Sequence, residues 1–440
     1  MASDGGPRAR NRAARPRPHL VLRHPHRALA ALRGRRAGVV ALVAVLGPGL
    51  LAGLSDDDPA GITTYSILGA DYGYRLLWVL ALSTFALIVF HELAVRLGVV
   101  TGKGLMRLVD ERYGRGATRG VLGALLIANV GTICAEFAGV AAGMQVLAGT
   151  SRYVTVPLAA AAVSVLVLRG SFRRVEHVLL ALSAIFVAYV VSGLLARPDW
   201  GAAARGLAVP GMPVTRDAVL VVVATVGTTL APWGLAFIQS YAVDKRLNVK
   251  DLRYERVDVI SGAVLTGIIG LFVTVACAAT LHAQGLHIDD AADAALALRP
   301  LASDAAKTLF GVGLVGAGLL AAAVVPLSTA YSVAEAFDKP CDLNDEFSAA
   351  PLFYGAYGAS VLLAVTLVLI PGAPLIPILF LTQALNAVLL LAILPFLRAL
   401  ARDPQLMGEN RLGRIDSAVT AVVIALVAVC VLTLLTLSVL

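Results

Sequence analysis

Residues Gly53 to Gly61 read Gly-Leu-Ser-Asp-Asp-Asp-Pro-Ala-Gly, and apolar sequence continues on both sides of them. On membrane-insertion scales one Asp near the bilayer centre costs roughly 2.5–3.5 kcal/mol, so three in a row are heavily penalised unless they serve a function. Pro59 lacks a backbone N–H and Gly61 loosens the chain, so we expect the helix to break here and to expose several carbonyl oxygens. Carboxylate and carbonyl oxygens together are the donors that hard cations prefer. The alternative is that the three acids lie at a helix end and face water.

The composition is that of a helical membrane protein. The chain has 440 residues, of which 58% are hydrophobic and 15% charged, and its mean hydropathy is +0.83. Apolar runs of about 20 residues alternate with short polar links, which is typical of a polytopic all-α membrane protein and not of a β-barrel. The four cysteines form no CxxC pair, so we expect neither disulfides nor a zinc site. The sequence also lacks a Gly-rich Lys-Ser/Thr phosphate loop, so we expect no ATP-driven pump, no enzyme and no cofactor.

The hydropathy predicts eleven transmembrane helices behind a basic tail. We expect residues 1–37 to be a disordered cytoplasmic tail, residues 38–400 to form the membrane core, and residues 416–440 to add an eleventh helix. The predicted spans are 38–70 (interrupted), 76–97, 121–147, 154–168, 178–195, 218–243 (interrupted), 257–281, 309–334, 352–370, 375–397 and 418–440.

Basic residues predict the orientation. Ten arginines lie in the tail, and the loops after the second, fourth, sixth and tenth spans are also basic, although the loop at 338–346 on the same side is acidic. The positive-inside rule therefore places the N-terminus in the cytoplasm and, with eleven spans, the C-terminus outside the plasma membrane. A basic tail can bind nucleic acid, but next to a membrane span it is more typical of a segment that contacts anionic lipid. We therefore expect membrane lipid as a partner, with no nucleic acid and no obligate protein partner.

A second interruption lies in the sixth span. Residues Val226 to Gly234 read Val-Gly-Thr-Thr-Leu-Ala-Pro-Trp-Gly and place a proline and two glycines inside an apolar helix. The two breaks are five spans apart, and an odd number inverts the second unit relative to the first. We therefore expect a 5+5 inverted repeat of residues 38–195 and 218–397, with helices 1 and 6 broken, as in LeuT-type transporters that work by alternating access. The alternative is that Pro232 only kinks its helix.

Several motifs resemble the Nramp family of divalent metal transporters. The similar stretches are Asp58-Pro59-Ala60-Gly61 with Gly69 to Tyr74 after it, Val99 to Leu105 after the second span, and Ala135-Glu136-Phe137 in the third span. The likeness covers most of residues 38 to 400. It implies transmembrane transport of divalent metal cations.

The resemblance also shows departures from the family pattern. The family's metal-binding Asp and Asn of the first helix fall on Asp58 and Gly61, and its span-six Met-Pro-His falls on Ala231, Pro232 and Trp233. In the third span, the family's proton route has an Asp where this chain has Ile133, and a Glu that this chain keeps as Glu136. In the tenth span, the family's Gln corresponds to Gln383, and Asn386 lies on the same helix face. These replacements resemble the Nramp-related magnesium transporter branch, which carries Ala for Met and is thought to work without proton coupling.

We expect Asp58 to bind the ion directly, with backbone carbonyls from Thr228 and Ala231. Thr229 could add a hydroxyl, and Asp57 and Gln383 could bind directly or through water, since Mg²⁺ dehydrates reluctantly. The residues expected around this set are Asp56 at an aqueous entrance, Gly61, Trp233 and Asn386, together with Glu136 as a pathway carboxylate or a buried structural acid. In span two, His91 and Glu92 could relay protons or could be structural partners of a loop or of Arg96.

Loss of the Met thioether removes the donor that favours softer transition metals, and an all-oxygen site suits Mg²⁺, Ca²⁺ or Mn²⁺. We therefore expect alternating-access transport of Mg²⁺, with Mn²⁺ also accepted and without obligatory proton coupling. The alternatives are a proton-coupled Mn²⁺/Fe²⁺ symporter of the same family, a carrier of amino acids or other organic solutes on the LeuT-type fold, and a non-transporting membrane sensor.

Overall fold

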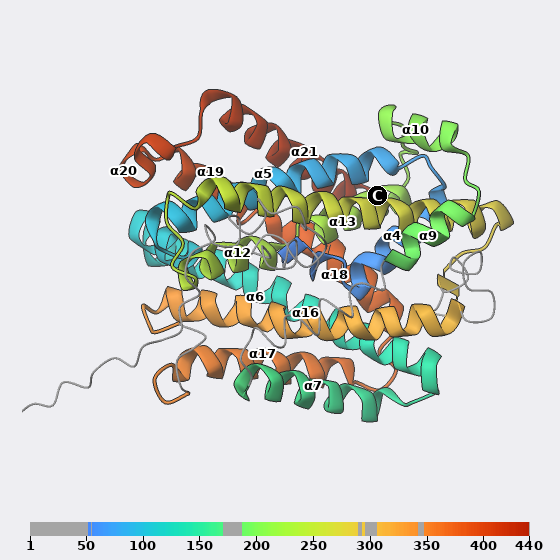
Figure 1. Ribbon diagram of the computed structural model, residues 1–440, viewed down its shortest axis with the longest axis horizontal. Helices are drawn as coiled ribbons and strands as arrows, with labels where there is room; N and C mark the ends of the chain where they lie inside the picture. The colour runs from blue at the N-terminus through green and yellow to red at the C-terminus, as the bar shows by residue number, and fades with distance from the viewer. Residues whose placement is uncertain are drawn as a thin grey trace, which may run out of the picture. The chain divides into compact units, whose positions relative to one another are not determined.

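The computed structural model describes residues 52–53, 55–169, 187–288, 293–294, 306–341 and 347–439, so the predicted tail 1–37 lies outside the described residues. Every regular element in these ranges is a helix (Figure 1). The helices are α4 (Pro59–Tyr72), α5 (Leu77–Thr101), α6 (Leu105–Ala148), α7 (Arg152–Arg169), α9 (Val187–Leu195), α10 (Trp200–Ala208), α11 (Arg216–Thr229), α12 (Pro232–Asp244), α13 (Leu252–Thr280), η2 (His282–Gln284), α16 (Ala306–Ala336), α17 (Pro351–Val368), α18 (Leu375–Leu390), α19 (Leu394–Arg402), α20 (Pro404–Met407), η5 (Gly408–Asn410) and α21 (Arg414–Val439).

Eight helical segments in the described ranges are long and apolar enough to cross a membrane, which confirms the prediction of a polytopic all-helical protein. Two of these segments are interrupted, one between α11 and α12 and the other between α18 and α19. The predicted number of eleven reaches beyond these ranges. The first predicted span begins before residue 52, the fifth is described only from Val187, and the fourth is the shorter apolar helix Arg152–Leu168. The count of eleven and the inverted repeat therefore stay predictions.

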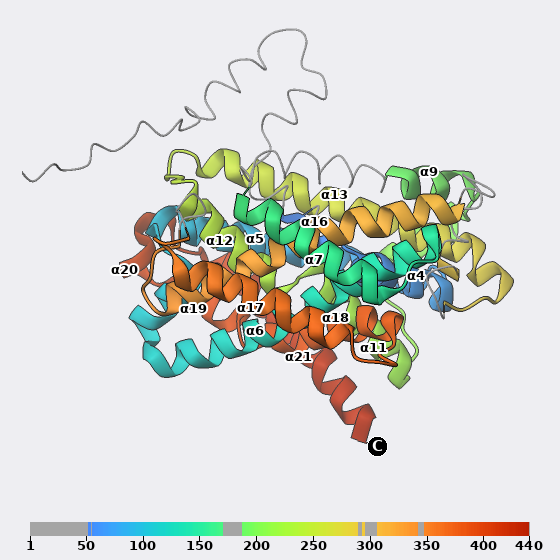
Figure 2. The same ribbon diagram turned by 90° about the horizontal axis from the view of Figure 1, so that it is seen from below.

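The long helices pack into connected layers. Helices α6, α16, α17 and α7 contact one another in one group, while α13 packs against α4, α5 and α9 (Figure 1 and Figure 2). Helices α4, α11 and α18 also contact one another, which brings the two predicted interruptions into the same part of the interior.

The sixth span is broken where Pro232 predicts it. Helix α11 ends at Thr229 and α12 begins at Pro232, with Leu230 (φ −111°, ψ 60°) and Ala231 (φ −67°, ψ 136°) between them. Proline has no N–H to donate to the preceding turn, so the last carbonyls of α11 lose the helical donors that a continuous helix would supply.

The first span is interrupted at the acidic run. Asp57 and Asp58 are not helical, and α4 begins at Pro59 with Asp58 as its N-cap. The Asp58 Oδ1 atom accepts a hydrogen bond from the backbone N–H of Gly61 at 2.5 Å. Proline suits the first position of a helix because that position needs no donor. The same Asp-Pro pair therefore ends one helical segment and starts the next.

Three elements differ from the predicted boundaries. Helix α6 begins at Leu105, because the basic segment before residue 121 is also helical and joins the span through a kink at Gly114 (φ 80°). The predicted span 375–397 divides into α18 and α19, and Pro395 in the first turn of α19 cannot donate to the turn before it. The short helix α10 was not predicted; Asp199 caps it by accepting from the N–H of Ala202 at 2.9 Å.

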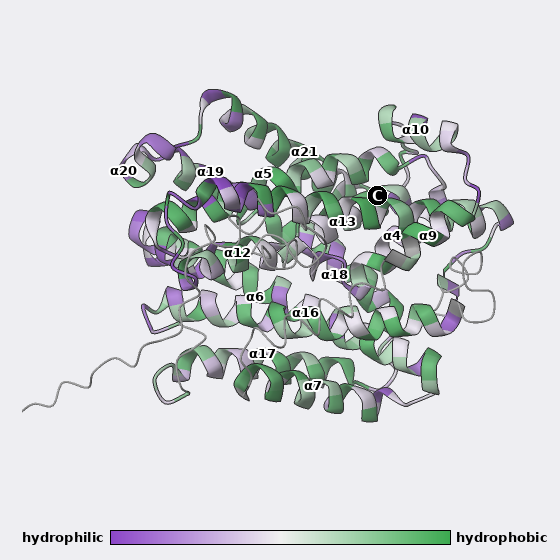
Figure 3. Ribbon diagram, in the orientation of Figure 1, coloured by the Kyte–Doolittle hydropathy of each residue, from purple (hydrophilic) through white to green (hydrophobic). Residues whose placement is uncertain are grey.

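The basic loops after the second, sixth and tenth predicted spans lie together, whereas residues 170–186 after the fourth span are outside the described residues. Arg112 of α6 forms an ion pair with Asp403 before α20 at 2.7 Å, and Arg107 pairs with Asp338 after α16 at 3.0 Å. Hydrophilic residues gather near α19 and α20, whereas the middles of the helices are mostly hydrophobic (Figure 3). The acidic loop after α16 therefore forms an ion pair with the basic segment of α6. Its negative charge is compatible with the prediction that both lie on the cytoplasmic side.

Small residues let α6 and α16 approach closely. A Cβ atom at Gly143 would lie 2.8 Å from the carbonyl oxygen of Gly311, and a Cβ atom at Gly311 would lie 2.7 Å from the Leu147 side chain. Close backbone approach at small residues is a common way for membrane helices to associate.

We expect Gly143→Ala to destabilise the protein, because the added methyl group meets backbone that can move only if the two helices separate. Overpacking of this kind costs about 1–3 kcal/mol. The matched control is Gly123→Ala on the same helix, where a Cβ atom meets nothing within 4 Å. Melting temperatures of the purified proteins in detergent measure the difference; equal values for the two variants would contradict the close packing of α6 on α16.

Candidate metal-binding site

The two helix breaks meet at Gly61. A Cβ atom at Gly61 would lie 2.8 Å from the backbone oxygen of Asp56, 3.2 Å from Asp58 Oδ1 and 3.3 Å from Thr228 Oγ1. Asp58 belongs to the first break and Thr228 to the end of α11, and both are buried, with 4% and 2% of their surface exposed. The structure therefore brings together residues that the sequence assigns to the same site from opposite halves of the chain.

Thr229 is held by a residue that sequence reasoning missed. The Thr229 hydroxyl donates to the carbonyl of Thr225 at 2.8 Å, and its oxygen lies 3.0 Å from the Tyr65 hydroxyl. This hydroxyl donates its proton to Thr225 and can accept from Tyr65, and its second lone pair is left to face an ion. Tyr65 follows Asp58 by seven residues, which is two helical turns and the same face of α4, and this spacing is the signal that could have found it.

Asp56 and Asp57 are buried next to Asp58. They expose 1% and 0% of their surface, and none of their four carboxylate oxygens has a hydrogen-bond partner among the described residues. Buried carboxylates require a cation, a proton or a hydrogen-bond donor to offset their desolvation. Asp56, which was expected at an aqueous entrance, lies in the interior in this conformation.

Glu136 lies beside Asp58 because of how α4 is seated. A Cβ atom at Gly139 of α6 would collide with the Pro59 side chain, and one at Gly318 of α16 would lie 3.2 Å from it, so the start of α4 is wedged between these helices. Glu136 is fully buried and close enough to Asp58 for their carboxyl groups to interact electrostatically. Neither Glu136 oxygen has a hydrogen-bond partner within the described ranges. Glu136 of α6 faces a carboxyl group at the start of α4, so both alternatives, a pathway carboxylate and a buried acid that links neighbouring helices, stay predictions.

Gln383 and Asn386 form a polar chain on α18. The Asn386 Nδ2 atom donates to Gln383 Oε1 and to Thr132 Oγ1, both at 3.0 Å. A Cβ atom at Gly227 would collide with the carbonyl oxygen of Gln383, so α18 lies directly against the last turn of α11. The Gln383 amide oxygen accepts one hydrogen bond from Asn386 and keeps a second lone pair, so direct and water-mediated contact with an ion both stay predictions.

Ala231 and Trp233 flank Pro232 at the start of α12. Ala231 is the N-cap, is 3% exposed and has no side-chain donor or acceptor. Trp233 is buried, and its carbonyl accepts a hydrogen bond from the Ser328 hydroxyl at 2.8 Å. Its indole N–H has no partner in the described part of the chain, and an indole N–H can only donate, so this side chain cannot bind a cation through nitrogen.

In the described ranges no group of three or more His, Cys, Asp and Glu side chains is arranged to hold a metal ion. A cation at the junction would therefore be bound by a mixture of the Asp58 carboxylate, hydroxyl oxygens and the carbonyls freed at the breaks. Oxygen donors of this kind suit hard divalent cations.

In span two, Glu92 and His91 behave differently. The Glu92 carboxylate accepts hydrogen bonds from Arg96 at 3.0 and 2.6 Å and from Arg256 at 2.6 Å. Glu92 is therefore a structural partner of Arg96, as the second alternative predicted. His91 is fully buried, and neither of its ring nitrogens has a partner among the described residues.

Comparison with known proteins identifies relatives of the whole core. Residues 49–437 match the family model described as natural resistance-associated macrophage protein-like, Nramp. The chain is 32% identical over 325 residues to the divalent metal cation transporter MntH of Burkholderia ambifaria, covering 70% of this chain and 73% of that protein. The crystal structure of the manganese transporter of Eremococcus coleocola aligns with a TM-score of 0.72 at 18% identity, over 92% of this chain and 87% of that one. MhsT in complex with L-phenylalanine aligns with a TM-score of 0.61 at 14% identity, over 90% and 98%, so the fold is LeuT-like.

We expect Gly61→Ala to weaken Mn²⁺ binding by about tenfold or more, because the methyl group would crowd the oxygens of Asp56, Asp58 and Thr228. Titration calorimetry of the purified protein measures the affinity. Gly116→Ala on α6, where a Cβ atom meets nothing within 4 Å, is the control. An affinity for Gly61→Ala equal to that of the control would place the ion elsewhere.

Proposed function

Because the chain belongs to the Nramp family of divalent metal transporters, we propose that it carries Mg²⁺, and also Mn²⁺, across the plasma membrane without obligatory proton coupling. Members of this family are membrane transporters and not enzymes, and their substrate is a divalent metal cation. In the proposed cycle the ion binds at the junction of the two breaks, which opens alternately to either side. The clustering of the basic loops after the second, sixth and tenth predicted spans supports a cytoplasmic N-terminus and, with eleven spans, an extracellular C-terminus.

The observation that carries the proposal is the side chain at Ala231. Its methyl group lies at the break between α11 and α12, at the position where the family pattern has a thioether. Without a soft sulfur donor the site has no feature that favours transition metals over abundant hard cations. Asp58 would bind the ion directly, with the carbonyls of Thr228 and Ala231. Asp57 and Gln383 would contact it directly or through water, which suits an ion that retains part of its hydration shell.

Two further replacements support transport without protons. Trp233 occupies the position of the family's histidine, and an indole does not take up a proton at physiological pH. Ile133 occupies the position of an acid in the family's proton route, and it is buried and apolar. An inside-negative membrane potential contributes about 2.3 kcal/mol per charge per 100 mV, which is enough to draw in a divalent cation without a coupled proton.

A proton-coupled Mn²⁺ or Fe²⁺ symporter is the second candidate. It is favoured by the pair of adjacent carboxyl groups at Asp58 and Glu136, which could exchange a proton. The relatives named as manganese and divalent metal transporters are compatible with either candidate. A carrier of amino acids shares the fold with MhsT, but the acidic run would repel the carboxylate of such a substrate.

Flux measurements separate these candidates. In proteoliposomes that contain a Mg²⁺ indicator and a pH dye, we expect Mg²⁺ uptake driven by an inside-negative potential without acidification of the lumen. Asp58→Asn should abolish this uptake, and it is a sharper variant than alanine because asparagine can still cap α4. Acidification of the lumen in proportion to Mg²⁺ entry would contradict transport without proton coupling. Unchanged Mg²⁺ flux in Asp58→Asn would show that Asp58 does not bind the ion.

Ala231→Met restores the thioether of the family pattern. We expect it to shift competition in favour of Mn²⁺ or Cd²⁺ over Mg²⁺ by about tenfold, because a soft donor would then face the ion. Leu230→Met is the matched control, since it adds the same thioether one residue away with little change of volume. The concentrations of Mn²⁺ and Cd²⁺ that halve Mg²⁺ uptake measure the shift. Equal shifts in the two variants would remove position 231 from the coordination of the ion.

A further inference from the structure

The structure leaves a second set of buried polar groups beyond the Asp58–Thr228 junction. His91 of α5 is fully buried with two unpartnered ring nitrogens, and Asp56 is buried with two unpartnered carboxylate oxygens, within the described ranges. An unsatisfied polar group in the interior costs about 1–3 kcal/mol. Glu92, the neighbour of His91, is already bonded to two arginines and faces a different environment.

These groups meet at the first turn of α12. A Cβ atom at Gly234 would lie 3.2 Å from His91 Nε2 and 3.7 Å from Asp56 Oδ1. The imidazole and the carboxylate therefore face the same point, and the absence of a side chain at Gly234 keeps that point accessible to both. They come from two different elements, α5 and the first break, and the third wall is α12.

Asp56 connects this point to the predicted site. Its backbone oxygen borders Gly61, beside Asp58 and Thr228, whereas its carboxylate borders Gly234. Thr228 lies on α11 and Gly234 on α12, so the two points are on opposite sides of the break in the sixth span. Asp56 therefore borders both points, with its backbone oxygen at one and its carboxylate at the other.

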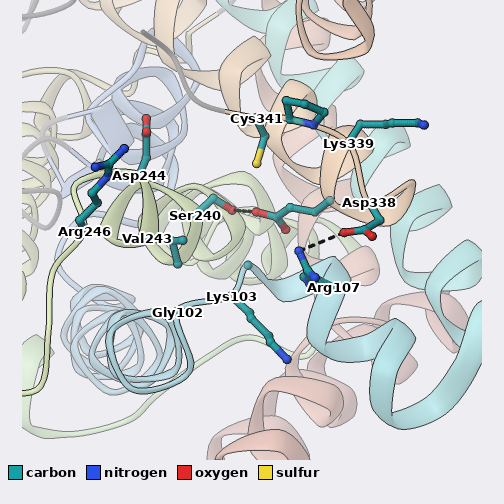
Figure 4. Close-up of a pocket in the computed structure, with 13 residues that line it drawn as sticks. Gly102, Lys103, Arg107, Ser240, Val243, Asp244, Arg246, Asp338, Lys339 and Cys341 are labelled. Atoms are coloured by element: carbon teal, nitrogen blue, oxygen red, sulfur yellow. Dashed lines mark hydrogen bonds and ion pairs between the residues drawn. The ribbon is translucent and has the colours of Figure 1, made fainter. Parts of the chain in front are cut away.

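The α12 side of the break leads toward the basic end of the helices. Gly234 and Ser240 are six residues apart on α12, about 9 Å along the helix axis. Ser240 lines a cavity of about 300 Å³ with Lys103, Arg107 and Glu335, and its hydroxyl donates to Glu335 Oε1 at 2.5 Å (Figure 4). The point at Gly234 therefore lies between the predicted site and a cavity on the side that the positive-inside rule assigns to the cytoplasm.

We propose that His91 and Asp56 form a second cation position on the transport route, on the α12 side of the break, and that the His91 nitrogen favours Mn²⁺ over Mg²⁺ there. The inference rests on the proposed function, because it concerns a later stage of the same route. An imidazole nitrogen suits first-row transition metals, whereas Mg²⁺ prefers oxygen. The position adds a preference for Mn²⁺ that the oxygen donors at the junction do not supply.

Two variants test the position from different directions. His91→Gln replaces the imidazole by an amide that offers Mg²⁺ an oxygen, so Mn²⁺ uptake into proteoliposomes should fall about tenfold while Mg²⁺ uptake changes less than about twofold. Gly234→Ala leaves both polar groups intact but places a methyl group between them, so uptake of both ions should fall about tenfold. Gly355→Ala on α17, where a Cβ atom meets nothing within 4 Å, should transport like the unmodified protein.

The outcomes are distinguishable from those of the proposed function. If the unmodified protein transports Mn²⁺ but not Mg²⁺, the proposed function fails, while the effect of His91→Gln on Mn²⁺ uptake still decides this inference. A proportional change in the uptake of both ions in His91→Gln would show a structural histidine and would overturn it, as would uptake in Gly234→Ala equal to that in Gly355→Ala. Melting temperatures in detergent identify variants that fail to fold; if His91→Gln is one of them, Gly234→Ala alone decides.

Discussion

A backbone that crosses lipid must satisfy its own hydrogen bonds, and this constraint explains where the protein can be irregular. The described spans are helical, and the interruptions at Asp57–Asp58 and at Leu230–Ala231 are both buried among other helices. Each interruption begins its second half with a proline, so the missing N–H falls where a helix start needs no donor. Irregular backbone is tolerated at membrane depth only where protein or a polar ligand surrounds it. The junction of the two breaks is therefore where this Nramp chain can offer oxygen atoms to a cation.

Packing around the junction depends on residues without bulk. Gly139 and Gly318 make room for Pro59, and this seating places Glu136 beside Asp58. Asp58 meanwhile caps α4, so the carboxylate expected to bind the ion also holds the helix that carries it. The hydrogen bond from the Gly61 N–H to Asp58 thus stabilises the start of α4 and also orients the proposed ligand.

Local chemistry made much of this arrangement predictable. Pro232 and Pro59 predicted the breaks, since a missing donor acts within one turn, and the apolar runs predicted most helices. The meeting of Asp58 with Thr228 followed from the matching positions of the breaks. The spacing of Tyr65 from Asp58 indicates which face of α4 it occupies, but not its partner Thr229 on another helix. The direction of His91 could not be predicted, because it depends on how α12 packs against α5. The apolar run continues past Leu391 and so predicts one helix, whereas Pro395, which cannot donate to the preceding turn, divides it into α18 and α19.

The contact at Gly227 limits how the protein can change shape. Because no side chain separates α11 from the backbone of Gln383, the two helices interlock and cannot slide past each other without losing that fit. We therefore expect helices α11 and α18 to move together, with Leu230 and Ala231 as the non-helical link between α11 and α12. Changes in the backbone dihedral angles of these two residues would be sufficient to reorient α12 while Thr228 keeps its position. The side of the proposed ion site that α11 and α18 form would thus remain stationary, while the side that α12 forms moves.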